Sequence, residues 1–504
     1  MDKSAATLAL DTEMTYRPPQ TSGANLVDSI KMKGIEDYTV IDAFVVDGLL
    51  NQRIQLSVPL DYSSAKLLAI KIVANVTQKY DKKLHTSIDT EVTFPAEPKP
   101  IAYCQGGPGF PCAVPLSCSS ITGYLVEKGY QIIYYDQRGT GLSSPLEVDT
   151  LLAAALDATS EEAKNAKMFE YILHFRADSI VRDMEVLRRA LLKEKKWLLL
   201  GQSYGGFCAF TYLSMYHESL EAVLITGGVP PIVQSADRVY EQTYKRTKER
   251  NVHYYRKYPQ DVNRVKKIIE YLSSNTVHLP AGGVLSPERF QQLGIRFGAT
   301  GGTDAIHQLV VEFSEALETI GKPTYSVLHK VEAEHNFDTN ILYALFQEAI
   351  YCNGPTQGAT RWAADRLRYS VGNENFVVTP SLLRGSEPVF FTGEMVYKLM
   401  FDDYTELRKI KQLGYDLHTF ELWSELYDTE KLSRITFDEV PIVAATYYYD
   451  QYVDFELTME TKKVFQENGN LRQYISSDHF HSGLRADTSR VLGALFKLLD
   501  SEID

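Results

Sequence analysis

Short apolar segments alternate with helical ones in two separate parts of the chain, and this alternation constrains the fold more than any other feature. Residues 99–104, 130–136, 197–201 and 220–228 have the length and the β-branched and aromatic content of buried strands. Helical patterns follow several of them, and the alternation resumes from 440 onward. Parallel strands need crossover connections of this kind. The sequence therefore predicts an α/β fold with a mostly parallel central sheet.

The stretch between the two alternating parts is long, charged and mostly helical. We expect it to form a helical cap over 232–436, inserted between the sixth strand and the strand that ends at Asp450. The sheet core then has a first part, 36–231, and a second part, 437–504. The pattern over 38–76 predicts antiparallel strands at the start of the core. The polar segment 1–35 is expected to be loosely ordered.

Three smaller patterns carry their own expectations. The segment 177–196 has helical spacing, with its apolar residues on one face and its charges opposite. The segment 339–351 is predicted to be a helix of the cap. The Gly-rich stretch 298–305 has no strand before it, which predicts a loop in the cap and not a phosphate-binding turn.

Composition excludes several classes of function. Hydrophobic residues make up 44% of the 504 residues, which is ample for a large core, and the net charge is −13. An acidic balance disfavours nucleic acid and anionic membranes as partners. The five cysteines are an odd number and form no C-x-x-C, so neither a disulfide framework nor a zinc site is expected. The first residues lack a signal-peptide pattern and no membrane-length apolar run follows, so we expect a cytoplasmic protein.

The motif that carries the most chemistry is "GQSYG", residues 201–205. It lies between an apolar strand and a helix, which is the context that makes G-x-S-x-G specific. A sharp turn there exposes a serine hydroxyl at the start of the helix. We therefore predict Ser203 as a nucleophile, with the backbone N–H of Tyr204 directed at developing negative charge.

A serine nucleophile needs a base and a residue that orients the base. In this architecture the order along the chain is Ser, Asp or Glu, then His, each after a later strand. Asp450 stands where a strand should end, and His481 opens the turn-like "HSGLR" before the last helix. Two alternatives stay open, because Asp454 could be the orienting carboxylate and His479 could be the base.

The loop "QGGPG", residues 105–109, follows the predicted strand 99–104. A tetrahedral oxyanion needs a second backbone donor from this part of the fold. We predict that Gly107 or Gly106 supplies that donor beside Tyr204. The next loop, "DQRGTG", is given a structural role in which Asp136 and Arg138 pair beneath the active-site loops.

Together these motifs resemble a known family. "GGPG", "DQRGTG", "FRADSIVRDMEVLRRAL", "GQSYGG", "YYYDQYVD" and "HSGLR", in that order, are similar to the proline iminopeptidases, which are α/β-hydrolase serine peptidases. The resemblance covers roughly 95–230 and 436–500. It implies an α/β-hydrolase fold with Ser203 as nucleophile, Asp450 as orienter and His481 as base.

The resemblance also implies a substrate. Family members release an N-terminal residue, preferably proline, and cap carboxylates bind its free amine. "LFQEAIYCNG" looks like the cap of the larger members, which makes Glu348 the first amine-binding candidate and Glu394 in "FTGEMVY" the second. The chain departs from the smaller bacterial members by its length and by Gln105, where they have His. Because specificity resides in the cap, these departures leave the proline preference open.

The expected function is therefore that of a serine aminopeptidase acting on a peptide or small molecule with a free N-terminal amine, without a cofactor. The first alternative is an α/β-hydrolase esterase or amidase that acts on small acyl compounds. The second is a catalytically inactive hydrolase fold used as a binding protein. A blocked substrate amine discriminates the first two functions, because only the aminopeptidase requires the free amine. The ordered set of Ser, Asp, His and oxyanion loop disfavours the inactive protein.

Overall fold

The structure is a computed structural model, and it describes residues 37–64, 68–94 and 99–501. One sheet of nine strands runs through the core in the order β1-β2-β3-β5-β4-β6-β7-β8-β9. The predicted segment 1–35 lies outside the described residues. The strands are β1 Thr39–Val46, β2 Leu49–Pro59, β3 Ala69–Lys79, β4 Pro100–Cys104, β5 Gln131–Asp136, β6 Trp197–Gln202, β7 Leu220–Thr226, β8 Ile442–Tyr447 and β9 Leu471–Ser476.

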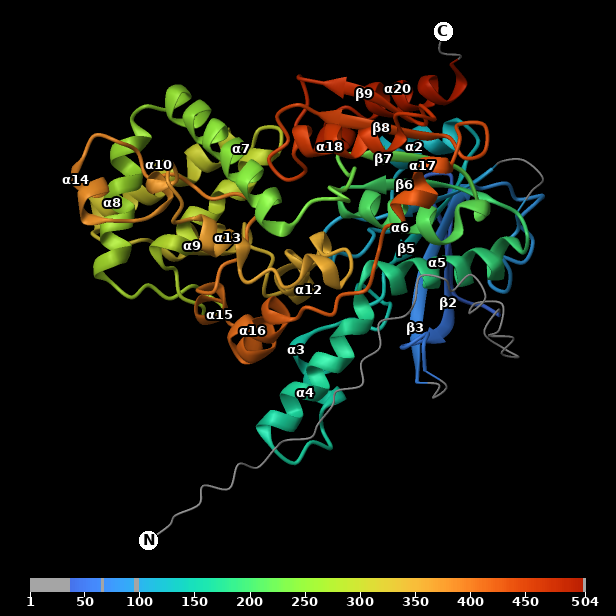
Figure 1. Ribbon diagram of the computed structural model, residues 1–504, viewed down its shortest axis with the longest axis horizontal. Helices are drawn as coiled ribbons and strands as arrows, with labels where there is room; N and C mark the ends of the chain where they lie inside the picture. Colours follow the sequence, from blue (N-terminus) through green and yellow to red (C-terminus); the bar gives the residue numbers. More distant parts are fainter. Residues whose placement is uncertain (1–36, 65–67, 95–98, 502–504) are drawn as a thin grey trace.

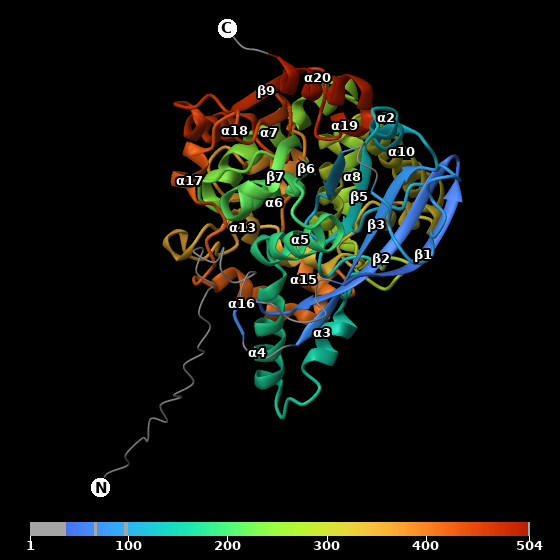
Figure 2. The ribbon, with the colours of Figure 1, turned by 90° about the vertical axis from the view of Figure 1, so that its right-hand side faces the viewer.

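The sheet is antiparallel at its N-terminal edge and parallel elsewhere, as the sequence predicts. β1, β2 and β3 pair antiparallel, and β3 pairs antiparallel with β5. From β5 onward through β4, β6, β7, β8 and β9 every pair is parallel. The three antiparallel strands form the long blue ribbon at one edge of the molecule (Figure 2).

Helices cover both faces of the sheet, as a parallel sheet requires. Successive residues of a strand point to opposite faces. Accordingly, Ala102 and Cys104 of β4 join the apolar cluster under α5 and α6, whereas Ile101 and Tyr103 join the cluster under α2 and α20. The helices of the core are α2 Ser120–Glu127, α3 Val148–Ala154, α4 Glu161–Ile172, α5 Ala177–Leu192, α6 Tyr204–Tyr216, α18 Phe455–Lys462, α19 Gly483–Ala486 and α20 Thr488–Asp500.

A large helical region separates β7 from β8 and lies to one side of the sheet (Figure 1). The predicted stretch 38–76 contains three strands, β1 among them, so β7 is the seventh strand along the chain and not the sixth. The helices of this region are α7 Ala236–Lys257, α8 Asp261–Ser274, α9 Pro287–Gln291, α10 Gly302–Ile320, α11 Tyr325–Ala333, α12 Ile341–Phe346, α13 Ala363–Leu367, α14 Pro380–Arg384, α15 Met400–Asp403, α16 Lys411–Thr419 and α17 Thr429–Arg434.

One predicted loop and one predicted helix of the cap differ in extent from the structure. The Gly-rich stretch 298–305 is a loop only over 299–301, because Gly298 ends a 3₁₀ helix and α10 begins at Gly302; Gly301 has a positive φ of 75°. The helix predicted over 339–351 ends at Phe346, and a short 3₁₀ helix follows at Ala349–Tyr351. Gln347 and Glu348 therefore lie at a break between two short helices.

α5 is buried almost all round, so its charged face does not lie in solvent. Asp183, Glu185 and Arg188 are each at most 3% exposed. Glu185 Oε1 accepts a hydrogen bond from Arg188 Nη2 at 2.8 Å, and its Oε2 accepts one from Tyr212 Oη at 2.6 Å. Burial of these charges is tolerated because each has a partner of opposite charge or a hydrogen bond.

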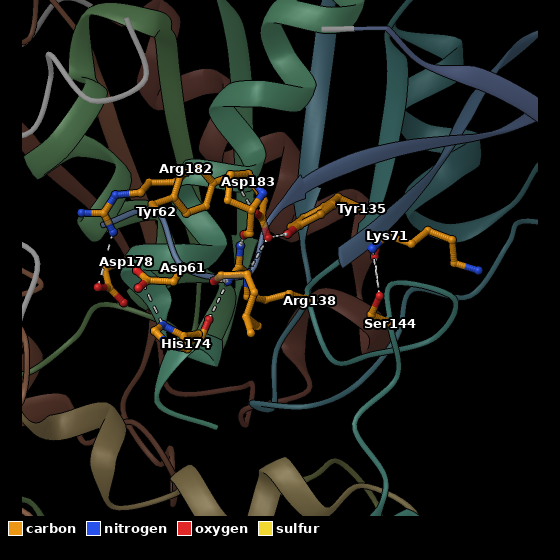
Figure 3. A network of polar contacts seen from close by, with 12 residues as sticks. Asp61, Tyr62, Lys71, Tyr135, Arg138, Ser144, His174, Asp178, Arg182 and Asp183 are labelled. Atoms are coloured by element: carbon orange, nitrogen blue, oxygen red, sulfur yellow. Dashed lines mark hydrogen bonds and ion pairs between the residues drawn. The ribbon is translucent and has the colours of Figure 1, made fainter. Parts of the chain in front are cut away.

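Arg138 pairs with Asp183 of α5 and not with Asp136, which corrects the predicted pairing. Arg138 Nη2 lies 2.6 Å from Asp183 Oδ1, and both side chains are fully buried. The same carboxylate accepts hydrogen bonds from the hydroxyls of Tyr62 and Tyr135 (Figure 3). Asp136 instead accepts backbone hydrogen bonds from Cys112 at 2.8 Å and Leu142 at 3.1 Å. The structural role predicted for the "DQRGTG" loop therefore rests on different partners.

Candidate active site

Ser203 occupies a strained turn between β6 and α6. Its backbone has φ 56° and ψ −125°, a left-handed conformation that is rare for residues other than glycine. The Ser203 N–H donates to the carbonyl of Thr226 on β7 at 3.0 Å, which anchors the turn to the sheet. The residue is 8% exposed. This is the geometry that presents a serine hydroxyl above the carboxyl edge of a sheet.

The backbone of β4 lies so close to the start of α6 that residue 205 must be a glycine. A Cβ placed on Gly205 would lie 1.9 Å from the carbonyl oxygen of Cys104 at the end of β4. No side chain fits there, so α6 can pack this closely against β4 only with glycine at that position. The motif thereby holds Ser203 beside the loop that follows β4.

His481 and Asp450 are brought together from the ends of β9 and β8. His481 Nδ1 lies 2.8 Å from Asp450 Oδ2. Asp450 Oδ1 accepts backbone hydrogen bonds from Tyr452 at 2.8 Å and Val453 at 3.0 Å, which fix the carboxylate. The Tyr452 ring packs edge-on against the imidazole at a centroid distance of 4.6 Å.

Two consecutive glycines after β7 lie between the His481–Asp450 pair and the turn that contains Ser203. A Cβ on Gly227 would lie 3.3 Å from both Asp450 Oδ2 and His481 Nδ1. A Cβ on Gly228 would lie 2.3 Å from the carbonyl oxygen of Ser203. The three predicted catalytic residues thus surround the same turn.

The two rival residues are engaged elsewhere. Asp454 caps α18, accepting backbone hydrogen bonds from Glu456 at 2.9 Å and Leu457 at 3.1 Å. His479 Nδ1 lies 2.7 Å from Ser476 Oγ, and its Nε2 lies 3.5 Å from Asp487 Oδ2.

The environment of His481 favours a proton on its ring. Burial lowers the pKa of the imidazole, but the charge and hydrogen bond of Asp450 outweigh burial and raise that pKa above its usual value. A base so placed is oriented by the carboxylate and stabilised once it has accepted a proton.

The loop after β4 lies against the nucleophile. A Cβ on Gly106 would lie 2.9 Å from Ser203 Cβ. The Gly106 N–H already donates to Oε1 of Gln105 at 3.0 Å. This leaves the N–H of Gly107 for an oxyanion, together with that of Tyr204, which is the first residue of α6 and has no acceptor within the helix.

Glu394 reaches the site from the cap. Its carboxylate accepts a hydrogen bond from the hydroxyl of Tyr343. Burial raises the pKa of Glu394 to about 7, His481 lowers it, and the charge of Asp450 raises it. Contacts of the neighbouring residues place Glu394 at this end of the sheet: a Cβ on Gly393 would lie 3.3 Å from Nε2 of Gln451, the residue after Asp450.

Glu348 is held within the cap. Its two carboxylate oxygens accept the N–H groups of Ala363 at 3.0 Å and Ala364 at 2.9 Å, at the start of α13. His418 Nδ1 also lies 3.0 Å from its Oε2. Both carboxylate oxygens of Glu348, the first predicted amine ligand, are thus engaged by groups of the cap.

The cap also contacts the histidine loop. The N–H of His481 donates to the carbonyl of Gly298 at 3.1 Å, and the N–H of Thr300 donates to Ser482 Oγ at 3.0 Å. A Cβ on Gly298 would lie 2.4 Å from the Tyr452 ring, so this approach requires glycine. The Gly-rich stretch of the cap therefore supports the histidine loop.

Comparison with known proteins decides the family. A family model described as the alpha/beta hydrolase fold matches residues 99–271. Proline iminopeptidase aneH of Aspergillus aculeatus is 37% identical over 410 residues, which cover 80% of this chain and 85% of that protein. A proline iminopeptidase of Aeromonas sobria is 36% identical over 403 residues, covering 79% and 87% of the two chains. The chain belongs to the proline iminopeptidase family.

Among solved structures, the proline iminopeptidase of Mycobacterium smegmatis aligns with 88% of this chain and 97% of its own. Its identity to this chain is 15%, with a TM-score of 0.36.

The contacts of several residues around this site have no signal in the sequence. Tyr343 lies outside the quoted motifs, and the motifs "YYYDQYVD" and "HSGLR" do not predict the contacts of Tyr452 and Arg485, because their partners are far away along the chain or in the cap. Gln105 stands out only through the resemblance, as the position where smaller family members have His.

The described residues hold no group of three or more His, Cys, Asp or Glu side chains suited to a metal ion. All five cysteines are free. No helix among residues 37–64, 68–94 and 99–501 is both long and apolar enough to cross a bilayer.

Proposed function

We propose that this chain is a serine aminopeptidase that releases an N-terminal residue, preferably proline, from peptides through an acyl-enzyme on Ser203. The names of the two relatives support the reaction and its preference for proline. The observation that carries the proposal is a cap carboxylate, Glu394, which is bound by Tyr343 and follows Gly393, a residue that packs against Gln451 beside Asp450. Hydrolysis of an ester has no need of this carboxylate, whereas recognition of a free amine does.

The geometry supports a two-step acyl transfer. His481 takes the proton of Ser203 Oγ as that oxygen attacks the carbonyl of the first residue. Asp450 keeps the imidazole oriented and stabilises its charged form, and Gly107 and Tyr204 donate their N–H groups to the oxyanion. The proton passes to the departing amine of the shortened peptide. Water, with His481 again as base, then releases the N-terminal residue and restores Ser203.

Glu394 sets the register of the substrate in this mechanism. An ammonium group beside the carboxylate favours the ionised form of Glu394, so binding lowers the pKa that burial has raised. A charge-assisted hydrogen bond to the α-amine then places the first carbonyl at Ser203. A peptide with a blocked amine loses this contact, which restricts cleavage to the first residue.

The test is hydrolysis of a fluorogenic panel by the wild-type protein and by Ser203→Ala and Glu394→Gln. The panel contains prolyl, alanyl and leucyl amides, their N-blocked forms and a short-chain aryl ester. We expect turnover of free-amine amides with proline fastest, loss on blocking, and a loss of several orders of magnitude in Ser203→Ala. Turnover of the ester alone would instead favour the esterase function, and full activity of Ser203→Ala would refute the acyl-enzyme.

A further inference from the structure

The side chain of Gln105 closes the loop after β4 on itself. Its Oε1 accepts the N–H of Gly106 at 3.0 Å, and its Nε2 donates to the carbonyl of Pro111 at 3.2 Å. Its backbone carbonyl accepts a hydrogen bond from Gln137 Nε2 at 3.0 Å. The Gln105 side chain therefore links the first residues of the loop to Pro111. Gln137 binds the backbone at the start of the same loop.

This closure bears directly on the oxyanion donors. With the Gly106 N–H bound to Gln105, Gly107 is the one of the two predicted donors that remains for an oxyanion. Gly106 also packs against Ser203 so closely that a Cβ would lie 2.9 Å from the serine Cβ. A shift of the loop would therefore change the distance between the Gly107 N–H and the reacting carbonyl.

Arg485 connects Gln105 with the other two catalytic segments. Its Nη2 donates to Gln105 Oε1 at 3.3 Å and to Gln202 Oε1 at 3.1 Å. Gln202 directly precedes Ser203, and Arg485 lies four residues after His481 on α19. One guanidinium nitrogen thus joins the oxyanion loop, the nucleophile turn and the segment that follows the base. The hydroxyl of Tyr103 also donates to Gln105 Oε1, at 3.3 Å.

We propose that Gln105 is a positioning residue for the oxyanion hole, and that Arg485 locks it to the nucleophile turn. The inference rests on the acyl transfer at Ser203 proposed above, but not on the identity of the leaving group. An oxyanion forms on amides and esters alike, so the contribution of Gln105 applies to either substrate. Gln105 acts on the transition state through the Gly107 N–H and touches no reacting atom.

The first variant is Gln105→Met, which keeps the length of the side chain and removes its amide. Loss of one oxyanion donor costs about 100- to 1,000-fold in kcat, and a misplaced donor costs up to about as much. We expect kcat to fall about 30- to 100-fold with KM changed less than about threefold. We also expect the affinity for a prolinal aldehyde, which forms a hemiacetal oxyanion on Ser203, to fall in parallel with kcat.

The second variant, Gln105→Glu, keeps the acceptor for the Gly106 N–H and for Arg485. We expect it to retain kcat within about tenfold of wild type, which a general loss of packing would not explain. Gln412→Met is the matched control, since Gln412 lies on α16 of the cap and donates to Asp416. It should leave kcat and aldehyde affinity unchanged.

Wild-type kcat and aldehyde affinity in Gln105→Met would overturn the inference. An equal loss in Gln105→Met and Gln105→Glu, accompanied by a lower melting temperature in both, would overturn it as well. If Ser203→Ala remains active, the acyl-enzyme proposal itself fails. If Ser203→Ala is inactive and Gln105→Met is not impaired, only the role of Gln105 fails.

Discussion

Asp450 holds His481 through one carboxylate oxygen and accepts two backbone N–H groups through the other. At the scale of single residues, this arrangement predicts the effect of Asp450→Asn. An asparagine amide cannot stabilise the imidazolium and favours the wrong tautomer, so we expect kcat to fall by about ten-thousand-fold. Steady-state kinetics on a prolyl amide measures the loss, with the fold checked by circular dichroism.

Asp454→Ala is the matched control for that variant. Asp454 caps α18, so its removal should cost about 1 kcal/mol of stability while kcat stays near wild type. A larger loss of kcat in Asp454→Ala than in Asp450→Asn would reassign the orienting carboxylate.

The pH dependence of kcat/KM should report His481 and Glu394 together. Both groups act unprotonated, and Asp450 raises the pKa of His481 against the effect of burial, whereas burial raises the pKa of Glu394 to about 7. Activity is therefore present above these pKa values and is lost as pH falls through them. We expect the acid limb of a log plot to approach a slope of two, with apparent pKa values that belong to the coupled pair.

Glu394→Gln should leave only one of these titrations. Its acid limb should have a slope of one, and its kcat/KM at high pH should fall about 10- to 100-fold, because a hydrogen bond to a charged group is lost. Tyr343→Phe serves as a comparison, since it removes the hydroxyl that binds Glu394 and keeps the charge. An unchanged slope in Glu394→Gln would show that Glu394 does not titrate with activity.

Among single residues, those with local signals are the ones that sequence predicts. Ser203 sits in a motif whose strand and helix are visible from periodicity, and Asp450 and His481 each follow a strand. No recognisable strand or motif precedes the two cap carboxylates. Glu348 and Glu394 belong to short helices and loops whose arrangement depends on packing between distant segments, so the sequence names both carboxylates but does not indicate the groups that bind them.

At the scale of elements, α5 shows how a buried ion pair joins segments that are remote in sequence. Arg138, after β5, donates to Asp183 of α5 and to the carbonyls of Pro59, Leu60 and His174. The spacing of 177–196 predicts the helix but not the burial of its charged face. The partner of Arg138 lies 45 residues away, and no local pattern indicates it.

Removing one member of this pair should destabilise the core strongly. Arg138→Met leaves the Asp183 carboxylate buried without a counter-charge, which costs about 3–5 kcal/mol. We expect a clear fall in the melting temperature, measured by calorimetry. The double variant Arg138→Met/Asp183→Leu should recover part of the loss, because neither charge is then left alone.

The exposed pair Arg490–Asp478 provides the control for the buried pair. Its side chains are 51% and 61% exposed, so Arg490→Met should cost less than about 1 kcal/mol. An equal effect of Arg138→Met and Arg490→Met would contradict the importance of the buried pair.

At the scale of the whole molecule, cap and core share one continuous apolar cluster, which runs from the α5 and α6 face of the sheet into the helices between β7 and β8. The last part of the predicted cap, α17, lies on the core, where the N–H of Asp428 donates to Ser214 Oγ on α6 at 3.1 Å. The cap therefore contacts the core in two places, at the candidate site and through α17, the last helix before β8. Helical periodicity indicates that such a region exists, but the surface on which it packs depends on contacts between distant segments.

Arg176 joins the two parts through several buried hydrogen bonds. It stands at the start of α5 and donates to the carbonyls of Ala349 at 3.0 Å, Cys352 at 2.7 Å and Ser424 at 3.2 Å. Its guanidinium also lies 4.6 Å from the centre of the Trp423 ring. Arg176→Met would remove one donor from each of these buried carbonyls, although Ala349 and Ser424 each keep a backbone donor, and would loosen the cap segment that contains Glu348 and its neighbours.

The Arg176→Met variant should affect amide and ester substrates differently. The proposed triad and oxyanion donors all come from the core, so hydrolysis of a small aryl ester should depend little on the cap. In the proposed function, recognition of the free amine requires Glu394 and hence a correctly seated cap. We therefore expect Arg176→Met to lower kcat/KM for a prolyl amide at least about tenfold, mainly through KM, while any ester turnover changes little. Faster hydrogen exchange over 341–352 and 420–427, with β6 and β8 unaffected, would identify the cap as the part that moves. An equal loss on both substrates would place the effect of Arg176 in the core instead, through α5 beneath the nucleophile turn.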